Sequence, residues 1–297
     1  MCIRDRIGMA KVFKNGDFRS GYYRDQTLLI AQGYLTPEDH FAALYAHPDI
    51  KYEPMSAGRQ MVGHFSNKLI DENGNWLDQT KQINHISDVS SIGAQMPRLV
   101  GLAQASKIYR KLDIRGSEKF SKNGNEIAWG TIGNAGTSEG IFFEAINAIG
   151  VLQIPIVMSV WDDGYGISVK NEKQTTKQSI SDALDGFKKE EDLSGIEILT
   201  VKGWDYSELI KTYSYASKLA RKNHIPVLVH VTELTQPLGH STSGSHERYK
   251  SKERLEWESE NDCNKKMRDW ILSNGFSVEK DLIEIENSIK NKLKEAR

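Results

Sequence analysis

The stretch from Trp129 to Ser168 most constrains the fold, because strand, turn and helix signals follow one another there at short intervals. The apolar, β-branched run Ile127–Ile132 predicts a strand, and the glycines after it predict a turn. Apolar residues then recur every three or four positions, which predicts a helix within Thr137–Leu152 with Ser138 as its N-terminal cap. A second apolar run, Ile156–Trp161, predicts the next strand. Together these elements make one β-strand, helix, β-strand unit.

The same alternation continues along the chain. Strand patterns at Ile196–Val201 and Pro226–Val231 flank a helical pattern at Tyr206–Arg221. Strands separated by helices of this length join through right-handed crossovers into a mainly parallel sheet with helices on both faces. We expect this α/β domain over residues 18–250 and a helical extension over 251–297. The apolar spacing of the last helix reaches the C-terminus without a Gly or Pro stop, so we expect a truncated end.

The composition limits the class of protein. The 297 residues, 38% of them hydrophobic, suit one large domain or a domain with an appendage. The net charge of −1 argues against nucleic-acid binding, and no apolar run is long enough to cross a membrane. Cys2 and Cys263 form no CxxC pair, so we expect a reducing cytoplasm and no disulfide framework or zinc site. The start MCIRDR lacks the apolar run of a signal peptide, and we expect residues 1–17 to be a foreign or truncated start.

Polar residues follow both strands of the central unit. Asn134 follows the first strand, and Asp162, Asp163 and Tyr165 follow the second. Parallel sheets bind ligands at this edge, and glycines at a helix start leave backbone N–H groups uncovered for a phosphate. Because side chains alternate along a strand, Asp163 and Trp161 should face one way and Asp162 the other. One carboxylate, one amide oxygen and a backbone carbonyl would suit Mg²⁺ beside a diphosphate.

A simpler interpretation stays open for these residues. Asp-Asp-Gly is ordinary turn chemistry, and a glycine-rich turn can be only a tight connection. The spacing of Gly133, Gly136 and Gly140 fits neither a Walker loop nor GxGxxG. The residue types alone therefore allow both a metal and diphosphate site and a plain pair of turns.

The central stretch resembles the α subunit of the thiamine diphosphate-dependent decarboxylating component of 2-oxo acid dehydrogenases, of the branched-chain and pyruvate types. The family's Gly-Asp-Gly motif maps onto residues 133–135, its Asn-Asn pair onto 162–163, and its Thr-Ser-Glu-Gly continuation onto 137–140. The usual aspartate is Asn134 here and the usual second asparagine is Asp163, so the two residue types have changed places. The pair still offers one negative charge and two oxygen ligands, and we expect Mg²⁺ binding to survive.

Two further motifs carry the resemblance: Tyr23-Arg24 is similar to the family's Tyr-Arg motif, and Gly239-His240-Ser241 to its Gly-His-Ser loop. The resemblance implies a catalytic role in substrate orientation or proton transfer for His240, whose ordinary pKa suits that work. For Mg²⁺ it implies Asn134, Asp163 and Tyr165. For the cofactor it implies Tyr23, Arg24, Ser90, Ile92, Ala135, Gly136, Tyr165 and His240.

The residues alone leave alternatives for three of these positions. Arg24 could pair with Asp25 at a helix start, Ile92 could be an ordinary core residue, and His240 could be a surface loop histidine. His64 lies in a stretch similar to one in the family, but a lone histidine is more often structural.

The resemblance implies the fold of thiamine diphosphate-binding proteins and oxidative decarboxylation of a small 2-oxo acid, with acyl transfer to a lipoyl group. The implied cofactors are thiamine diphosphate and Mg²⁺. The implied partners are a β half or β subunit of the same component, fused or separate, and a lipoyl acyltransferase. In the family the glutamate that activates thiamine belongs to the β half, so we expect this chain alone to be inactive. An acetoin-type thiamine enzyme and a non-catalytic interaction subunit remain alternatives.

Overall fold

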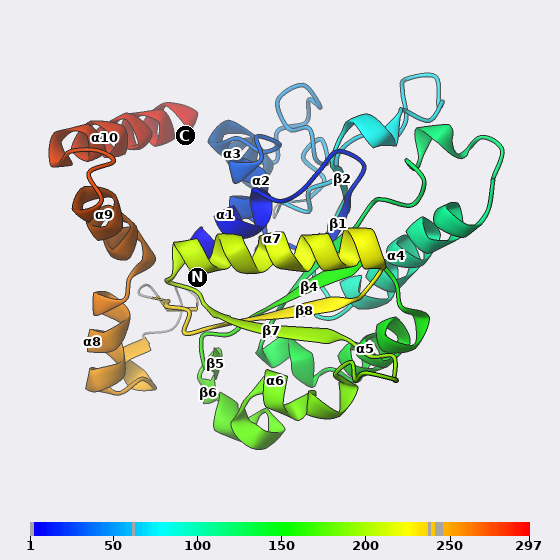
Figure 1. The fold of residues 1–297 in the computed structure, drawn as a ribbon. Coiled ribbons are helices and arrows are strands. Elements are labelled where there is room, and N and C mark those ends of the chain that lie inside the picture. Colours follow the sequence, from blue (N-terminus) through cyan, green and yellow to red (C-terminus); the bar gives the residue numbers. More distant parts are fainter. Residues whose placement is uncertain (1–2, 61–62, 237–238, 241–245) are drawn as a thin grey trace.

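The computed structural model describes residues 3–60, 63–236, 239–240 and 246–297, and over these residues the fold is built on a six-stranded parallel sheet. Its strand order is β2, β1, β3, β4, β8, β7 (Figure 1). This confirms the predicted α/β class with a mainly parallel sheet. The strands are β1 (Phe18–Tyr22), β2 (Asn84–Val89), β3 (Ala128–Gly133), β4 (Ile156–Trp161), β7 (Glu197–Lys202) and β8 (Val227–Thr232).

Helices cover both faces of this sheet and extend beyond one end of its strands (Figure 1). They are α1 (Ile3–Ala10), α2 (Gln26–Ala31), α3 (Pro37–Leu44), α4 (Gln95–Lys111), α5 (Gly140–Leu152), α6 (Ile180–Ala183), α7 (Tyr206–Asn223), α8 (Lys252–Glu260), α9 (Cys263–Ser273) and α10 (Glu279–Ala296). Short 3₁₀ turns are η1 (Gln79–Lys81), η2 (Ser117–Lys119), η3 (Ala135–Ser138), η4 (Asn171–Lys173), η5 (Thr176–Gln178), η6 (Asp185–Phe187) and η7 (His246–Arg248). A small antiparallel hairpin joins β5 (Tyr165–Gly166) to β6 (Val169–Lys170).

The start of α5 differs from the prediction. The turn η3 intervenes between β3 and α5, and Glu139 rather than Ser138 occupies the N-cap position, without a side-chain cap. The Ser138 hydroxyl instead donates to the Gln174 carbonyl at 3.3 Å. The prediction of Ser138 as the cap was therefore wrong, because the glycine-rich turn adds a 3₁₀ segment before the helix begins.

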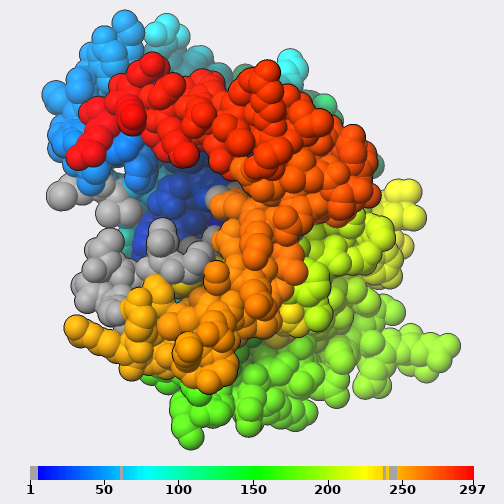
Figure 2. Space-filling view, turned by 90° about the vertical axis from the view of Figure 1, so that its left-hand side faces the viewer, coloured from blue at the N-terminus to red at the C-terminus, as the bar shows by residue number. Residues whose placement is uncertain are grey.

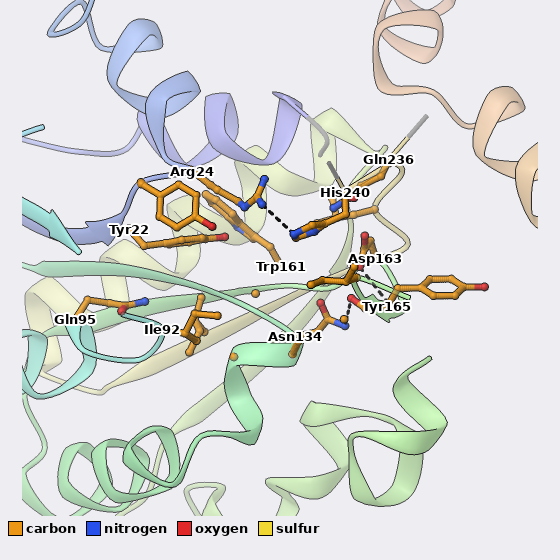
Figure 3. Close-up of a pocket in the computed structure, with 18 residues that line it drawn as sticks. Tyr22, Arg24, Ile92, Gln95, Asn134, Trp161, Asp163, Tyr165, Gln236 and His240 are labelled. Atoms are coloured by element: carbon orange, nitrogen blue, oxygen red, sulfur yellow. Dashed lines mark hydrogen bonds between the residues drawn. The ribbon is translucent and has the colours of Figure 1, made fainter. Parts of the chain in front are cut away.

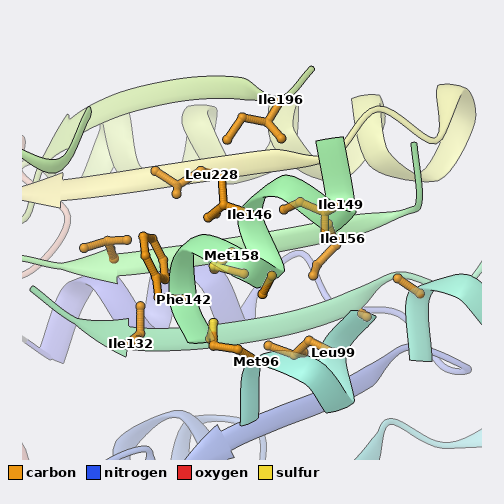
Figure 4. Packing of buried hydrophobic residues seen from close by; sticks show 14 of the residues in the cluster. Met96, Leu99, Ile132, Phe142, Ile146, Ile149, Ile156, Met158, Ile196 and Leu228 are labelled. Carbon is orange, nitrogen blue, oxygen red and sulfur yellow. The ribbon is translucent and has the colours of Figure 1, made fainter. Parts of the chain in front are cut away.

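Each face of the sheet has its own hydrophobic core, because side chains along a strand alternate between faces. On one face Val157 and Val229 pack in a cluster with residues of α1 and α7. On the other face Met158 and Leu228 pack with residues of α4 and α5 (Figure 4). Burial on both sides explains why β4 and β8 are almost continuously apolar. The helix α1 belongs to this packing, since Met9 is fully buried.

The register of the sheet aligns the ends of its central strands. Gly133 at the end of β3 lies opposite Trp161 at the end of β4, and Trp161 lies opposite Val231 in β8. The backbone N–H of Asn134 donates to the Trp161 carbonyl at 3.1 Å, and that of Asp162 donates to the Val231 carbonyl at 2.9 Å. The residues after these three strands therefore leave the sheet side by side.

The C-terminal part forms the predicted helical extension. Three α-helices, α8, α9 and α10, lie in residues 246–297. Figure 2 shows them, orange to red, curving along the rim of a hollow with the N-terminal segment in dark blue at its base, and α10 reaches α3. In the described part of the chain, no helix combines the length and apolar character needed to cross a bilayer.

Candidate functional site

A cavity of about 340 Å³ opens at the carboxyl ends of the strands (Figure 3). Its lining residues come from five parts of the chain, namely 22–24, 92–95, 132–136, 161–167, and 234–236 together with His240. Each segment lies at or just beyond the end of a different strand, namely β1, β2, β3, β4 and β8. The parallel topology alone brings these segments together, since such sheets bind ligands at this edge.

The glycine-rich turn after β3 forms one wall of the cavity. A Cβ atom on Gly136 would lie 2.9 Å from side-chain carbons of both Ile132 and Ile92, so a larger residue would displace them. Ile92 lines the cavity with 57% of its surface exposed. The alternative that Ile92 is an ordinary core residue is therefore wrong.

At the end of β4 the side chains alternate as predicted. Trp161 and Asp163 line the cavity, whereas Asp162 faces β8 and accepts a hydrogen bond from Nε2 of His230 at 3.0 Å. Asp163 is only 8% exposed, and burial raises the pKa of its carboxyl to about 6. Burial favours the neutral acid, and a cation beside Asp163 would reverse that preference.

The carboxamide of Asn134 is fixed on the same side of the cavity. Its Nδ2 donates to the Tyr165 carbonyl at 3.0 Å, drawn as a dashed line in Figure 3, and to Oδ1 of Asn171 at 2.7 Å. Asn134 and Asp163 both line the cavity, with the Tyr165 backbone beside them. Both residues of the exchanged pair therefore line the same cavity.

Arg24 and His240 meet on the opposite side (Figure 3), with 3.0 Å between Nη2 of Arg24 and Nε2 of His240. A guanidinium can only donate, so Nε2 accepts and the neutral ring carries its hydrogen on Nδ1. Burial, followed by the Arg24 charge, lowers the pKa of His240. The alternative of a surface pair between Arg24 and Asp25 is wrong, because Asp25 is fully buried.

A buried ion cluster supports the segments that carry Arg24 and Ile92. Arg19 is fully buried, and its guanidinium contacts Asp25 at 2.7 Å and Asp88 at 2.6 Å, while its Nε donates to Nδ1 of His85 at 3.0 Å. These contacts tie the end of β1 to the end of β2. Two carboxylates share one cation here, and burial raises the pKa of Asp88 to about 6 against the opposing effect of Arg19.

Helix α8 supports the turn after β4 from outside the cavity. Nη2 of Arg254 donates to the Asp163 carbonyl at 2.7 Å, and its Nε contacts Glu258 at 2.8 Å. Glu258 also pairs with Lys250 at 2.7 Å, and both of these side chains are 1% exposed. The extension is therefore anchored directly at the candidate site.

Most predicted site residues reach the cavity, but Ser90 does not line it. The Ser90 hydroxyl is paired with Nε2 of His64 at the surface. Ser241 of the Gly-His-Ser loop lies outside the described residues. The predicted residues that line the cavity are Tyr23, Arg24, Ile92, Asn134, Ala135, Gly136, Asp163, Tyr165 and His240.

The sequence did not identify several other residues of this region. Tyr22, Gln95, Leu234 and Gln236 line the cavity. The position of Leu234 and Gln236, between a strand end and the Gly-His-Ser loop, was a signal that could have found them. Nothing in the sequence pointed to Asn171, which reaches Asn134 only through the folded β5–β6 hairpin.

Among the residues that the structure describes, no group of three His, Cys, Asp or Glu side chains could hold a metal ion. A cation at this cavity would therefore depend on amide and carbonyl oxygens together with Asp163. Mg²⁺ accepts such mixed oxygen ligands and commonly completes its shell with substrate phosphates.

The chain is similar to known proteins along its length. The family described as dehydrogenase E1 component matches residues 4–297. The 2-oxoisovalerate dehydrogenase subunit alpha of Bacillus subtilis is 27% identical over 240 residues, which cover 81% of this chain and 61% of the relative. The pyruvate dehydrogenase E1 component subunit alpha of Rickettsia bellii is 30% identical over 205 residues, 69% of this chain and 56% of the relative.

A plant relative extends the comparison. The 2-oxoisovalerate dehydrogenase subunit alpha 2, mitochondrial, of Arabidopsis thaliana is 28% identical over 243 residues, 80% of this chain and 44% of the relative. The chain thus spans between 44% and 61% of the length of these three curated relatives. The family match includes all but the first residue of α1 and the whole helical extension.

Proposed function

This chain belongs to the dehydrogenase E1 component family, and on that basis we propose that it is the α part of a thiamine diphosphate-dependent 2-oxo acid dehydrogenase. The proposed reaction is oxidative decarboxylation of a branched-chain 2-oxo acid or of pyruvate, followed by acyl transfer to a lipoyl group. The two kinds of relative, named as 2-oxoisovalerate and pyruvate dehydrogenase subunits, support these two substrates.

One observation carries this proposal. Residues of motifs that lie far apart in the sequence, Tyr23-Arg24, Asn134 to Gly136, Asp163 to Tyr165 and His240, converge on one cavity. Chance similarity of short motifs would not bring all of them to the same edge of the sheet. The alternative that the acidic and glycine-rich turns are only connections leaves this convergence unexplained.

The cavity has the features that thiamine diphosphate requires. Gly136 lines the cavity without a side chain, Arg24 offers a planar set of donors for diphosphate oxygens, and exposed Ile92 offers an apolar surface for a ring. Bound there, thiamine diphosphate would supply the electron sink that decarboxylation needs and that side chains lack. We assign it to Tyr23, Arg24, Ile92, Ala135, Gly136, Tyr165 and His240, all of which line the cavity.

The proposed Mg²⁺ ligands are Asn134, Asp163 and the carbonyl of Tyr165. The atoms that they would offer to the cation are a carboxamide oxygen, a carboxylate and a backbone carbonyl. Mg²⁺ prefers such oxygen ligands. The Tyr165 carbonyl accepts one hydrogen bond from Asn134, and a carbonyl oxygen has a second lone pair for a ligand. Asp163 would supply the single negative charge that the family's aspartate supplies from the other position.

We propose that His240 orients the substrate or transfers a proton at the reacting end of the cavity. Its Nε2 is held by Arg24, which leaves Nδ1–H as the group that can donate. The lowered pKa of His240 keeps the ring neutral near pH 7, so it would act there as a hydrogen-bond donor rather than as a cationic acid.

The proposed partners follow from the family. A β half or β subunit would complete the active site, and a lipoyl acyltransferase component would accept the acyl group. We also propose that the protein works in the cytoplasm.

Calorimetric titration of the assembled α and β parts with thiamine diphosphate, with and without Mg²⁺, tests the proposal. We expect binding that requires Mg²⁺ and is lost in Asp163→Ala. The control is Asp185→Ala, which changes an exposed carboxylate paired with Lys188 and should leave binding intact. Absence of binding, with recovery in Asn134→Asp, would support a non-catalytic subunit instead.

An activity assay then separates the substrates. Decarboxylation of 3-methyl-2-oxobutanoate or pyruvate with reduction of lipoamide is the expected result. Activity on acetoin alone would contradict the proposal and favour the acetoin-type alternative.

A further inference from the structure

A chain of buried and partly buried hydrogen bonds leads from β8 to the cavity. It runs from His230 to Asp162, then to Asn171 and finally to Asn134. Of these four residues only Asn134 lines the cavity, within the part of the chain that the structure describes. The other three therefore act on the site through their neighbours.

We infer that Asn171 and Asp162, held by His230, are positioning residues that turn the carboxamide oxygen of Asn134 toward the cavity. This inference rests on the proposed function, in which that oxygen is a ligand of the cation. A carboxamide has only one oxygen, so its direction decides whether it can serve as a ligand.

Asp162 decides which groups donate and which accept along this series of hydrogen bonds. Its carboxylate accepts hydrogen bonds from the backbone of Gly164 at 2.7 Å, from Asn171 Nδ2 at 2.9 and 3.0 Å, and from His230 Nε2 at 3.0 Å. Both oxygens of Asp162 face N–H groups in these contacts, so the carboxylate acts as the acceptor toward Asn171.

His230 keeps Asp162 in place. His230 is 2% exposed and Asp162 is 7% exposed, so neither side chain can exchange its partner for bulk water. The second ring nitrogen of His230, Nδ1, lies 3.0 Å from the Ser181 hydroxyl on α6. The ring is therefore held at both ends, and it presents Nε2–H to the carboxylate.

The orientation of Asn171 follows from that of Asp162. Because Asp162 only accepts, Asn171 must turn Nδ2 toward it and Oδ1 away from it. The backbone N–H of Asn171 also donates to the Gly164 carbonyl at 3.0 Å, which fixes the start of η4 against the turn after β4. A reversed Asn171 carboxamide would place its oxygen against the carboxylate of Asp162.

The orientation of Asn134 follows in turn. Its Nδ2 must face Oδ1 of Asn171, at 2.7 Å, and the same nitrogen reaches the Tyr165 carbonyl at 3.0 Å. Reversing the Asn134 carboxamide would place its oxygen against two acceptor oxygens. The remaining atom, Oδ1, is therefore directed to the cavity side. A carboxylate at this position would need no such orientation, since both of its oxygens can be ligands.

This difference gives a test by double substitution in the assembled α and β complex, with the Mg²⁺ dependence of thiamine diphosphate binding measured by calorimetry. Asn171→Ala should weaken Mg²⁺ binding about 10- to 100-fold, as expected when a residue that orients a ligand is lost. In the Asn134→Asp background Asn171→Ala should change Mg²⁺ binding less than about 3-fold, because a carboxylate at position 134 needs no orientation by Asn171. The effects of two such coupled residues are not additive. Asp162→Asn, which can also donate to Asn171, should give a smaller loss that Asn134→Asp likewise suppresses.

Controls separate positioning from general damage. Glu172→Ala changes the exposed neighbour of Asn171 in the same 3₁₀ turn and should leave Mg²⁺ binding and the thermal midpoint unchanged. The inference would be overturned if Asn171→Ala and Asp162→Asn each weakened Mg²⁺ binding by the same factor with and without Asn134→Asp. These residues would then have only a structural role. If the unsubstituted complex binds thiamine diphosphate without any Mg²⁺ dependence, the inference fails while the cofactor assignment stands. If it binds no thiamine diphosphate at all, the proposed function fails as well.

Discussion

Arg24 and His240 are 216 positions apart in the sequence, yet each decides the chemistry of the other. Arg24 forces Nε2 of His240 to accept a hydrogen bond, and its charge adds to burial in lowering the pKa of His240. His240 in return holds one end of the guanidinium in the cavity. Single side chains at this site therefore have properties that the residue types alone would not give them.

Substitution of Arg24 should partly restore the ordinary titration of His240. In Arg24→Gln the pKa of His240 should rise, because the neighbouring positive charge is gone, but it should stay below the ordinary value because burial is the larger cause. NMR titration of the ring Cε1–H measures this directly. An unchanged or lowered pKa would show that Arg24 does not lower the pKa of His240 as proposed. Arg59→Gln, at an exposed arginine that does not line the cavity, serves as the control.

Asp88 should make stability depend on pH. Its pKa is about 6 in the folded chain against about 3.9 when unfolded, so its contribution is fully present below about pH 4 and is lost as the pH rises through about 6. The loss amounts to about 2–3 kcal/mol. The unsubstituted chain should therefore lose free energy of unfolding between pH 4.5 and pH 7 through Asp88. Asp88→Asn lacks this loss, so its free energy of unfolding minus that of the unsubstituted chain should rise over the same interval. Urea unfolding at both pH values checks this, and parallel pH profiles for the two proteins would contradict it.

At the scale of elements, the functional edge depends on pieces that do not themselves line the cavity. Helix α8 holds the turn after β4 through Arg254, and the small β5–β6 hairpin brings η4 back to Asn134. In α8 the two cations, Lys250 just before the helix and Arg254 within it, share the single carboxylate of Glu258. One buried acid thus holds both of these cations in place.

Removal of that acid should be costly. Glu258→Ala leaves Lys250 buried without its carboxylate, and we expect a loss of about 3–5 kcal/mol in the free energy of unfolding. Glu256→Ala on the same helix is the matched control: its side chain is 63% exposed beside Lys252, and its removal should cost less than about 1 kcal/mol. Chemical denaturation of both variants measures the difference. Similar losses in the two variants would mean that the buried Glu258 pair contributes no more to the free energy of unfolding than the exposed Glu256 pair does.

At the scale of the whole molecule, stability is distributed unevenly. The sheet is buried on both faces by two clusters, whereas α10 has no buried residue and exposes Ile283, Ile285, Ile289 and Leu293. Glu279 and Glu286 of α10 pair with Arg268 of α9 at the surface. Such surface ion pairs add little to the free energy of unfolding. The end of the extension is thus held by much less apolar burial than the sheet.

Hydrogen exchange should reveal this gradient. Amides of β3 and β4 should exchange only through global unfolding, while those of α10 should exchange through local opening at much lower free energy. Mass spectrometry of exchanged peptides from the isolated chain measures both regions together, with α5 as a helical control packed in the core. Equal protection of α10 and α5 would contradict the expectation.

The sequence by itself determined the architecture, because the period of apolar residues differs between strands and helices and is readable locally. It also determined where the polar residues after β3 and β4 had to lie and which way Asp162 and Asp163 had to face, since both follow from strand geometry. The prediction of Ser138 as the N-cap was wrong, because the short 3₁₀ turn η3 produces no apolar periodicity in the sequence.

Only the tertiary structure decided how the site residues act on one another. The neutral state of His240, the buried cluster around Arg19, the contact of Arg254 with the turn after β4 and the role of Asn171 all depend on pairs distant in the sequence. Such pairs form when crossovers and hairpins bring separate segments together. Local periodicity carries no information about them, because hydrogen bonds and charge interactions depend on distance in space and not on separation along the chain.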